Sequence, residues 1–281
     1  MELGYAFSSE EHGPLDLVRH ARAAEEAGFG FGLISDHFHP WVPRQGHSPF
    51  VWSVIGGIAG ATERFRLGTG ENLNEHVTGA RWPAPDERIE MLEEAIAVIR
   101  LLWEGGTKTH RGKHYTVDHA RIYTLPDPPP PIYVAAAAPN AAELAGRAGD
   151  GLISVAPDEE IVSTFERAGG AGKPKVGMTH FCWAETEEEG RRTAHELWPT
   201  SGLKGPLNQE LALPEYFEEA AEGVTEEDVA EQVPHGPDPA PMLEEIRSFA
   251  EAGFTHVYAH QVGPAQQGFL KFAKRELLPH V

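Results

Sequence analysis

One order of features occurs twice in this sequence and restricts the fold more than any other: a helix, a glycine, a short apolar strand and a polar residue. In the first passage, Glu26–Ala27–Gly28–Phe29 leads into an apolar run that ends at Asp36 and His37. In the second, Glu251–Ala252–Gly253–Phe254 leads into a run that ends at His260. Glycine commonly follows the last residue of a helix, where the backbone turns left-handed. Helices that alternate with short buried strands are typical of a parallel α/β sheet, and in a βα barrel the chemistry lies at the strand ends.

The same alternation continues along the chain and predicts seven strands. They are expected at residues 3–7, 31–34, 64–68, 132–135, 152–155, 175–183 and 255–259. A closed (β/α) barrel has eight strands. We therefore predict an α/β fold of the TIM type, a (β/α) barrel shortened by about one βα unit. Ser48 followed by Pro49 predicts a helix start, with Ser48 as the N-cap.

The predicted barrel is a single domain that covers residues 1–281. Alternating residues predict an inserted β-hairpin at about residues 107–126, and less regular sequence predicts a second insertion at about residues 199–236. The proline run at residues 128–131 leads directly into a strand and is interpreted as a rigid connection rather than a recognition motif.

Composition restricts the partners. The net charge of −20 argues against nucleic acid and anionic membrane surfaces as partners. The single cysteine, Cys182, excludes an internal disulfide and fits a reducing compartment. No apolar run is long enough to span a bilayer, and the first residues do not resemble a secretion signal. We expect a cytoplasmic protein with a small-molecule substrate.

Titratable side chains follow the first three predicted strands. Asp36 and His37 end the second strand, and Glu71 follows the third. Glu10 or Glu11, after the first strand, is a further candidate. Because the carboxyl ends of parallel strands meet at one mouth, these groups are expected to form an acid–base pair there.

The segment Gly68–Thr69–Gly70 precedes Glu71, and Asn74 lies shortly after it. Glycines permit close approach of a flat or phosphorylated ligand, although a lone Gly-x-Gly is also an ordinary strand-to-helix turn. Phe38 and Trp41 offer flat apolar walls for an aromatic cofactor.

Metal binding is the alternative use of the histidines, of which the chain has 15. His37 and His39 are two residues apart and need not converge, and the histidines of the predicted hairpin lack a recognised zinc spacing. We predict no metal site.

Together these segments resemble the luciferase-like flavin and deazaflavin superfamily, in particular its coenzyme F420-dependent oxidoreductases related to glucose-6-phosphate dehydrogenase. The likeness covers nearly the whole chain. The motifs that carry it are Leu3–Gly4–Tyr5, Ser35–Asp36–His37–Phe38 with Pro40–Trp41, Thr69–Gly70–Glu71 with Leu73–Asn74–Glu75, Ala145–Gly146–Arg147–Ala148–Gly149–Asp150–Gly151, and Glu276–Leu277–Leu278–Pro279.

The resemblance implies roles for the residues at the strand ends. His37 would take the hydroxyl proton while a substrate alcohol gives hydride to the deazaflavin, and Glu71 would assist protonation of the cofactor. Asp36 would contact the cofactor, while Trp41 and Glu10 would stabilise the site. The cofactor would also be held by Thr69, Gly70, Asn74, and by Ala137, Ala138 and Asn140 at a turn before a helix.

The expected cofactor is coenzyme F420, and the expected reaction is hydride transfer with a small uncharged alcohol or carbonyl compound. An FMN-dependent luciferase-like monooxygenase and a vestigial cofactor-binding protein without turnover are the alternatives. The resemblance also implies a homodimer.

Two departures from the relatives affect this expectation. Basic residues that would hold a sugar phosphate are replaced by Thr179–His180 and by Gln266–Gln267–Gly268, so glucose 6-phosphate is not expected as the substrate. A strand–helix–strand passage of the relatives, which packs against the deazaflavin, is missing between Gly68 and Thr69. We therefore predict weaker cofactor binding than in intact relatives.

Overall fold

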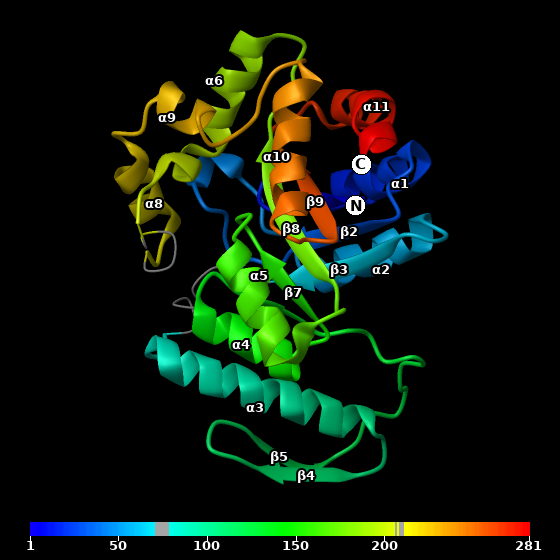
Figure 1. Cartoon of the computed structure of the whole chain (residues 1–281). Coiled ribbons are helices and arrows are strands. Elements are labelled where there is room, and N and C mark those ends of the chain that lie inside the picture. The colour runs from blue at the N-terminus through cyan, green and yellow to red at the C-terminus, as the bar shows by residue number, and fades with distance from the viewer. Residues whose placement is uncertain (71–78, 206, 208–210) are drawn as a thin grey trace. The chain divides into compact units, whose positions relative to one another are not determined.

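The computed structural model of the chain describes residues 1–70, 79–205, 207 and 211–281. Seven strands form one sheet in the order β3-β2-β1-β9-β8-β7-β6 (Figure 1). The pairings of β1 with β2 and β9, of β2 with β3, and of β7 with β6 and β8 are parallel. The strands are β1 (Glu2–Phe7), β2 (Phe31–Ser35), β3 (Arg66–Gly70), β6 (Tyr133–Ala135), β7 (Gly151–Ser154), β8 (Lys175–Phe181) and β9 (His256–Gln261).

The prediction of a shortened α/β barrel is confirmed. β3 and β6 are the two edges of this strand order and are not paired with each other among the described residues, so the sheet is open. The helices are α1 (Pro14–Ala27), α2 (Val51–Ala61), α3 (Pro85–Trp103), α4 (Pro139–Ala148), α5 (Glu159–Phe165), α6 (Glu187–Leu197), α8 (Pro214–Ala221), α9 (Glu226–Ala230), α10 (Pro239–Glu251) and α11 (Gln266–Glu276).

The chain divides into two compact units. Unit 1 comprises Met1–Trp82, Met178–Ala250 and His256–Val281, and unit 2 comprises Pro83–Gly177 and Glu251–Thr255. Unit 2 includes a two-stranded antiparallel hairpin of β4 (Lys108–Arg111) and β5 (Thr116–Ala120). Glu94 of α3 holds this hairpin, because its carboxylate contacts His110 and accepts the backbone N–H groups of His114 and Tyr115.

The core of unit 1 lies between its strands and the helices α1 and α11. Tyr5 of β1 packs edge-to-face on Phe29, which directly follows α1 and its C-cap glycine, and lies near Phe269 of α11. Phe181 of β8 also lies near Phe269. Because side chains alternate along a strand, the residues next to Tyr5 and Phe181 point to the opposite face.

That opposite face carries polar side chains at the carboxyl ends of the strands. Ala6 of β1 is in register with His260 of β9, so the two share a face, and His180 of β8 contacts His260. Ser35 of β2 reaches the loop after β1 on the same side. The strand pattern therefore gathers hydrogen-bonding groups from four strands at one end of unit 1.

The expected junction between Gly68 and Thr69 lies inside β3. Gly68 pairs in register with Leu33, and Thr69 with Ile34, without a bulge. β3 thus joins the two sides of the missing passage into one strand that hydrogen-bonds to β2.

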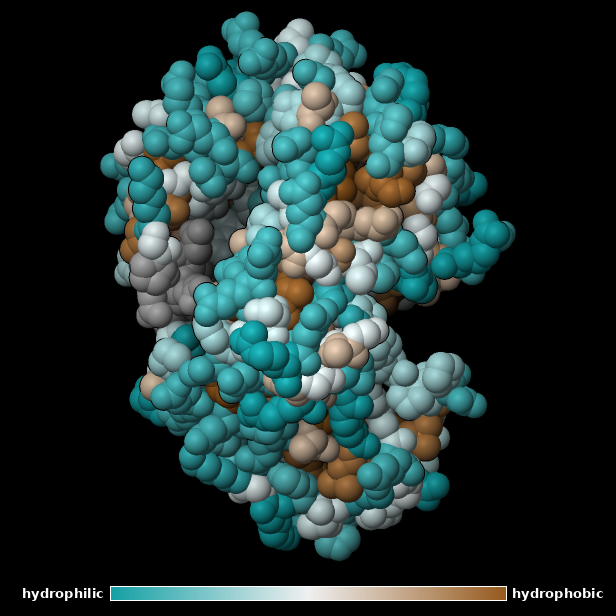
Figure 2. All heavy atoms as spheres, in the orientation of Figure 1, coloured by the Kyte–Doolittle hydropathy of each residue, from teal (hydrophilic) through white to brown (hydrophobic). Residues whose placement is uncertain are grey.

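The face of the molecule shown in Figure 2 is mostly hydrophilic, as the net charge of −20 leads us to expect. None of the described helices is long and apolar enough to cross a membrane.

Candidate functional site

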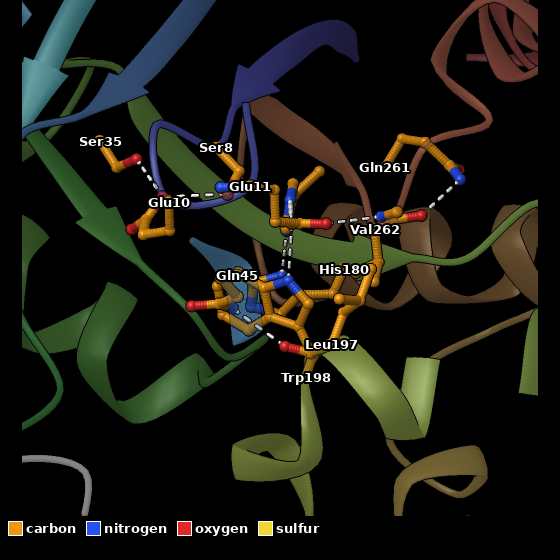
Figure 3. Close-up of polar contacts among 12 residues, drawn as sticks. Ser8, Glu10, Glu11, Ser35, Gln45, His180, Leu197, Trp198, Gln261 and Val262 are labelled. Carbon is orange, nitrogen blue, oxygen red and sulfur yellow. Dashed lines mark hydrogen bonds and ion pairs between the residues drawn. The ribbon is translucent and has the colours of Figure 1, made fainter. Parts of the chain in front are cut away.

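The loop after β1 places two neighbouring carboxylates in the interior of unit 1. Glu10 is 2% exposed, and the Glu11 side chain is 3% exposed. Figure 3 shows that the two side chains have different partners. Glu10 accepts hydrogen bonds from Ser8 and Ser35, whereas Glu11 accepts the indole N–H of Trp198. Each carboxylate therefore has its own set of partners.

Glu10 forms a buried ion pair with His37, the predicted base. Its Oε1 atom contacts Nδ1 of His37, and its Oε2 atom accepts the hydroxyls of Ser8 at 2.9 Å and Ser35 at 2.6 Å. Burial alone would raise the pKa of the Glu10 carboxyl, but His37 and Ser35 outweigh it and lower this pKa to about 2. Glu10 is therefore an ionised acceptor that fixes the His37 ring.

The segment after β2 holds His37 from its other sides. The Ser48 hydroxyl donates to the His37 carbonyl, and the Trp41 ring lies edge-to-face on His37 at 5.6 Å between ring centroids. Trp41 in turn packs on Phe217 of α8, with centroids 5.1 Å apart. Gln45 accepts the Trp41 backbone N–H at 2.9 Å and donates to the Leu197 carbonyl at 3.0 Å (Figure 3). His37 thus lies beside the apolar Trp41 ring and contacts the charged Glu10 carboxylate.

A second polar chain begins at Glu11, which was predicted only as the alternative to Glu10. Glu11 Oε1 contacts Nε2 of His260 at 3.0 Å and accepts the indole N–H of Trp198 at 2.7 Å, while Oε2 accepts the Gly263 backbone N–H at 2.6 Å. The Nδ1 atoms of His260 and His180 lie 2.7 Å apart. His260 is the polar residue that ends the second repeated passage of the sequence. Its position was the sequence feature that could have indicated this network.

The predicted cofactor-binding residues of unit 1 lie where β2 and β3 end. The Asp36 backbone N–H donates to the Gly70 carbonyl at 3.1 Å, and the Thr69 hydroxyl donates to the Ile34 carbonyl at 3.0 Å. Thr69 shares the face of Ile34, which is fully buried. Glu71 and Asn74 lie outside the described residues. Phe38, the second predicted wall, is 73% exposed, whereas Trp41 is 8% exposed.

The other predicted cofactor residues, Ala137, Ala138 and Asn140, lie at the start of α4 in unit 2. Ala138 is the N-cap and makes no side-chain capping bond, Pro139 follows it, and no acidic residue lies in the first turn. The first amides of a helix carry partial positive charge and favour anions. The role of this helix start in binding the anionic tail of a cofactor stays a prediction.

The alternative metal ligands are arranged differently. His39 Nδ1 lies 3.0 Å from the Pro40 carbonyl, and His37 is engaged by Glu10. Across the described part of the chain, no group of three or more His, Cys, Asp or Glu side chains is placed to hold a metal ion.

A buried carboxylate–histidine pair at the strand ends of a shortened βα barrel defines a candidate enzyme of the barrel class. The sequence profile of the luciferase-like monooxygenase family matches residues 1–74 and 67–256, and the chain belongs to this family.

Curated relatives match over the full length. The chain is 30% identical over 329 positions to the F420-dependent glucose-6-phosphate dehydrogenase of Nocardia farcinica, covering 100% of this chain and 98% of the relative. It is 31% identical over 327 positions to the enzyme of the same name from Beutenbergia cavernae, covering 100% and 97%.

Solved structures share the fold. An F420-dependent secondary alcohol dehydrogenase in complex with an F420–acetone adduct superimposes with a TM-score of 0.90 at 24% identity, covering 100% of this chain and 99% of the other. The F420-dependent tetrahydromethanopterin reductase of Methanopyrus kandleri gives 0.72 at 19% identity, covering 99% of both.

The lengths of these matches bear on the missing passage. The first alignment has 329 positions and this chain has 281 residues, so about 48 positions of the relative lie opposite gaps. The two profile matches overlap at residues 67–74, around the junction in β3. The gap positions show that this chain is shorter than the relative, and the overlap of the profile matches supports an internal deletion near this junction.

Proposed function

We propose that this chain is an F420-dependent oxidoreductase that transfers a hydride between a small uncharged alcohol or carbonyl compound and the deazaflavin. The observation that carries the proposal is the buried Glu10–His37 pair, which supplies a fixed base at the strand ends. Full-length similarity to enzymes named F420-dependent dehydrogenases supports the choice of cofactor and reaction.

His37 is the proton acceptor in the alcohol-oxidising direction. The Glu10 carboxylate contacts Nδ1 of His37 and so orients the ring for taking the hydroxyl proton of the substrate. Because the pKa of Glu10 is about 2, its carboxylate stays charged. This negative charge stabilises the imidazolium that forms when His37 takes the proton. In the reverse direction, His37 returns this proton to the carbonyl oxygen. Trp41 limits water access to His37 and keeps its ring in place.

The cofactor contacts that the family resemblance implies are part of this proposal. F420, when bound, supplies a deazaflavin ring that accepts or donates the hydride. In unit 1, Asp36, Thr69 and Gly70 would contact it, together with Asn74, and Glu71 would assist its protonation. In unit 2, the amides that follow Ala137 and Ala138, with Asn140, would bind its anionic tail.

An uncharged substrate is supported by what stands at the positions of the sugar-phosphate clamp. Thr179 lies 3.4 Å from Glu245, and burial together with His260 lowers the pKa of His180 to about 3, so His180 is neutral. Gln266 is buried and donates to the carbonyls of Gln261 and Gly263 at 2.7 and 2.6 Å. These groups supply no cation for a phosphate.

Titration of the purified protein with F420 and, separately, with FMN tests the cofactor. We expect quenching of F420 fluorescence with weaker affinity than in relatives that retain the missing passage, and reduction of F420 by members of an alcohol panel. Preference for FMN, with activity that requires a reductase, would support the monooxygenase instead. Binding of neither cofactor would overturn the proposed function.

A further inference from the structure

The hydroxyl of Ser35, the last residue of β2, is bonded both to the loop after β1 and to the Glu10 carboxylate in that loop. The Ser9 backbone N–H donates to Ser35 Oγ at 2.9 Å, and the Ser9 hydroxyl donates to the Ser35 carbonyl at 2.8 Å. Ser35 Oγ also lies 2.6 Å from Oε2 of Glu10 (Figure 3). One serine thus joins the end of β2 to the loop that carries the carboxylate.

The charge of Glu10 decides the direction of these bonds. Its pKa is about 2, so the carboxylate is ionised at neutral pH and only accepts. Ser35 therefore gives its single hydroxyl proton to Oε2 of Glu10, and its oxygen accepts the Ser9 N–H. The other acceptor near this hydroxyl is the Phe7 carbonyl at 3.4 Å. Because a hydrogen bond to a charged group is roughly twice as strong as a neutral one, the proton stays on the side of Glu10.

The two oxygens of the Glu10 carboxylate serve two residues of one segment. Oε2 accepts the Ser35 hydroxyl, and Oε1 contacts Nδ1 of His37, two residues further along the chain. The last torsion of a glutamate side chain has broad minima, so hydrogen bonds have to fix the plane of its carboxylate. Ser8 also donates to Oε2, at 2.9 Å, but it belongs to the same loop as Glu10. Ser35 instead fixes the carboxylate relative to the segment that carries His37.

We propose that Ser35 is a positioning residue for the base, whose hydroxyl turns the Glu10 carboxylate so that Oε1 faces His37. Ser35 acts on His37 only through Glu10. Without the hydroxyl, Ser8 still holds Oε2, but the carboxylate can turn away from the ring. The protonated form of His37 then loses part of its stabilisation by the opposite charge. This inference rests on the proposed function for the role of His37 as a base, but the contacts that carry it do not depend on a cofactor.

The first test needs neither cofactor nor turnover. The protein labelled with ¹⁵N-histidine is titrated with acid and base, the ring nitrogens are observed by NMR, and His37→Asn assigns the His37 signals. We expect Ser35→Ala to move the titration midpoint of His37 to lower pH by about 0.5–1 unit, within the spread that folded surroundings commonly produce. Ser35→Thr keeps a hydroxyl and should restore the wild-type midpoint. An unchanged or raised midpoint in folded Ser35→Ala would overturn the proposal.

Ser9→Ala is the matched control. It removes the hydroxyl that donates to the Ser35 carbonyl, and so weakens the same connection between the loop and β2. It leaves the Ser9 backbone N–H and the bond from Ser35 to Glu10 in place. We expect the His37 midpoint of Ser9→Ala to stay close to that of the wild type. A shift as large as that of Ser35→Ala would mean that the connection as a whole matters and not the hydroxyl on Glu10, which contradicts the proposal.

The second test measures the steady-state kinetics of F420 reduction with isopropanol. Ser35→Ala should lower kcat and kcat/KM by the same factor of about 10 to 100, since misplacing a reacting group by about 1 Å can cost about 100-fold. In a His37→Ala background the same change should have no further effect, because Ser35 acts through His37. A loss confined to KM, or an equal loss in both backgrounds, contradicts the proposal. A wild type that does not reduce F420 instead contradicts the proposed function, and the NMR titration then decides on Ser35 alone.

Discussion

Glu10 and Glu11 are neighbours in the sequence, yet their carboxylates bind different kinds of donor. Glu10 is bound by two serine hydroxyls and by His37 directly. Glu11 is bound by an indole N–H, a backbone N–H and His260, behind which His180 lies. Glu10 thus contacts one histidine, whereas Glu11 contacts the first of two linked histidines.

The difference matters because a histidine next to a carboxylate gains a proton easily, whereas the second histidine of a pair does not. Burial and His260 lower the pKa of His180 to about 3, so it stays neutral at ordinary pH. His37, by contrast, contacts a carboxylate whose charge stabilises its protonated form. The arrangement around His37 suits transfer of a proton, whereas the one around His260 keeps His180 neutral.

The largest expected effect separates these two roles in catalysis. His37→Ala should lower kcat for F420 reduction by about 10²- to 10⁴-fold, the usual contribution of a general base. His260→Asn disturbs the contacts with Glu11 and His180 but removes no proposed base, so it should lower kcat by only about 2- to 12-fold. Steady-state kinetics of both folded variants checks the comparison. Equal losses of kcat in the two variants would contradict the assignment of His37 alone as the general base.

Glu10 is expected to make the larger contribution to stability of the two carboxylates, and its effect depends on pH. Its pKa falls from 4.5 to about 2 on folding, so the charged form is stabilised in the folded state. This contribution is present above pH 4.5 and is lost as the pH falls toward 2, and it amounts to about 3 kcal/mol. Glu10→Gln should therefore lower the free energy of unfolding at pH 7 by about this amount and by roughly half as much at pH 3. Urea unfolding at both pH values measures it, and a pH-independent difference would contradict the assigned cause.

Glu11→Gln should cost about 1–3 kcal/mol of unfolding free energy at pH 7, because an amide nitrogen then faces at least one of the three donors. A side-chain amide offers one accepting oxygen where the carboxylate offers two, so either Trp198 or Gly263 loses its acceptor. Chemical unfolding gives the cost, and tryptophan fluorescence of the folded protein reports on Trp198. A variant as stable as the wild type would show that these bonds are made to water in solution.

Much of this architecture was predictable from local sequence. The apolar runs located all seven strands, and the glycine after the first helix, Gly28, has the left-handed backbone expected of a C-cap, with φ of 116°. Glu10, His37 and Trp41 were predicted as site residues and lie together. Such predictions succeed because the spacing of apolar residues and the residue preferences of turns depend only on neighbours in the sequence.

The network behind Glu11 was not predictable in this way, since its bonds join residues far apart in the sequence. Glu11 and His260 are 249 positions apart and meet only because β9 pairs with β1. Ser48 illustrates the same limit locally. It was expected to cap a helix, but α2 begins at Val51 with Phe50 as its N-cap, and the Ser48 hydroxyl instead binds the His37 carbonyl. Tertiary contacts decided between two acceptable hydrogen bonds.

The smallest expected effect is a control for both buried carboxylates. Glu218 pairs with Arg44 at 3.2 Å, and both side chains are more than 40% exposed. Exposed ion pairs contribute about 0–1 kcal/mol because water and salt screen them. Glu218→Gln should therefore change the unfolding free energy by less than about 1 kcal/mol, and any change should shrink at high salt. Suppose that Glu218→Gln lowered the unfolding free energy as much as Glu10→Gln does. Loss of an exposed and of a buried carboxylate would then have the same consequence. The effect of Glu10 could not be ascribed to its burial beside His37.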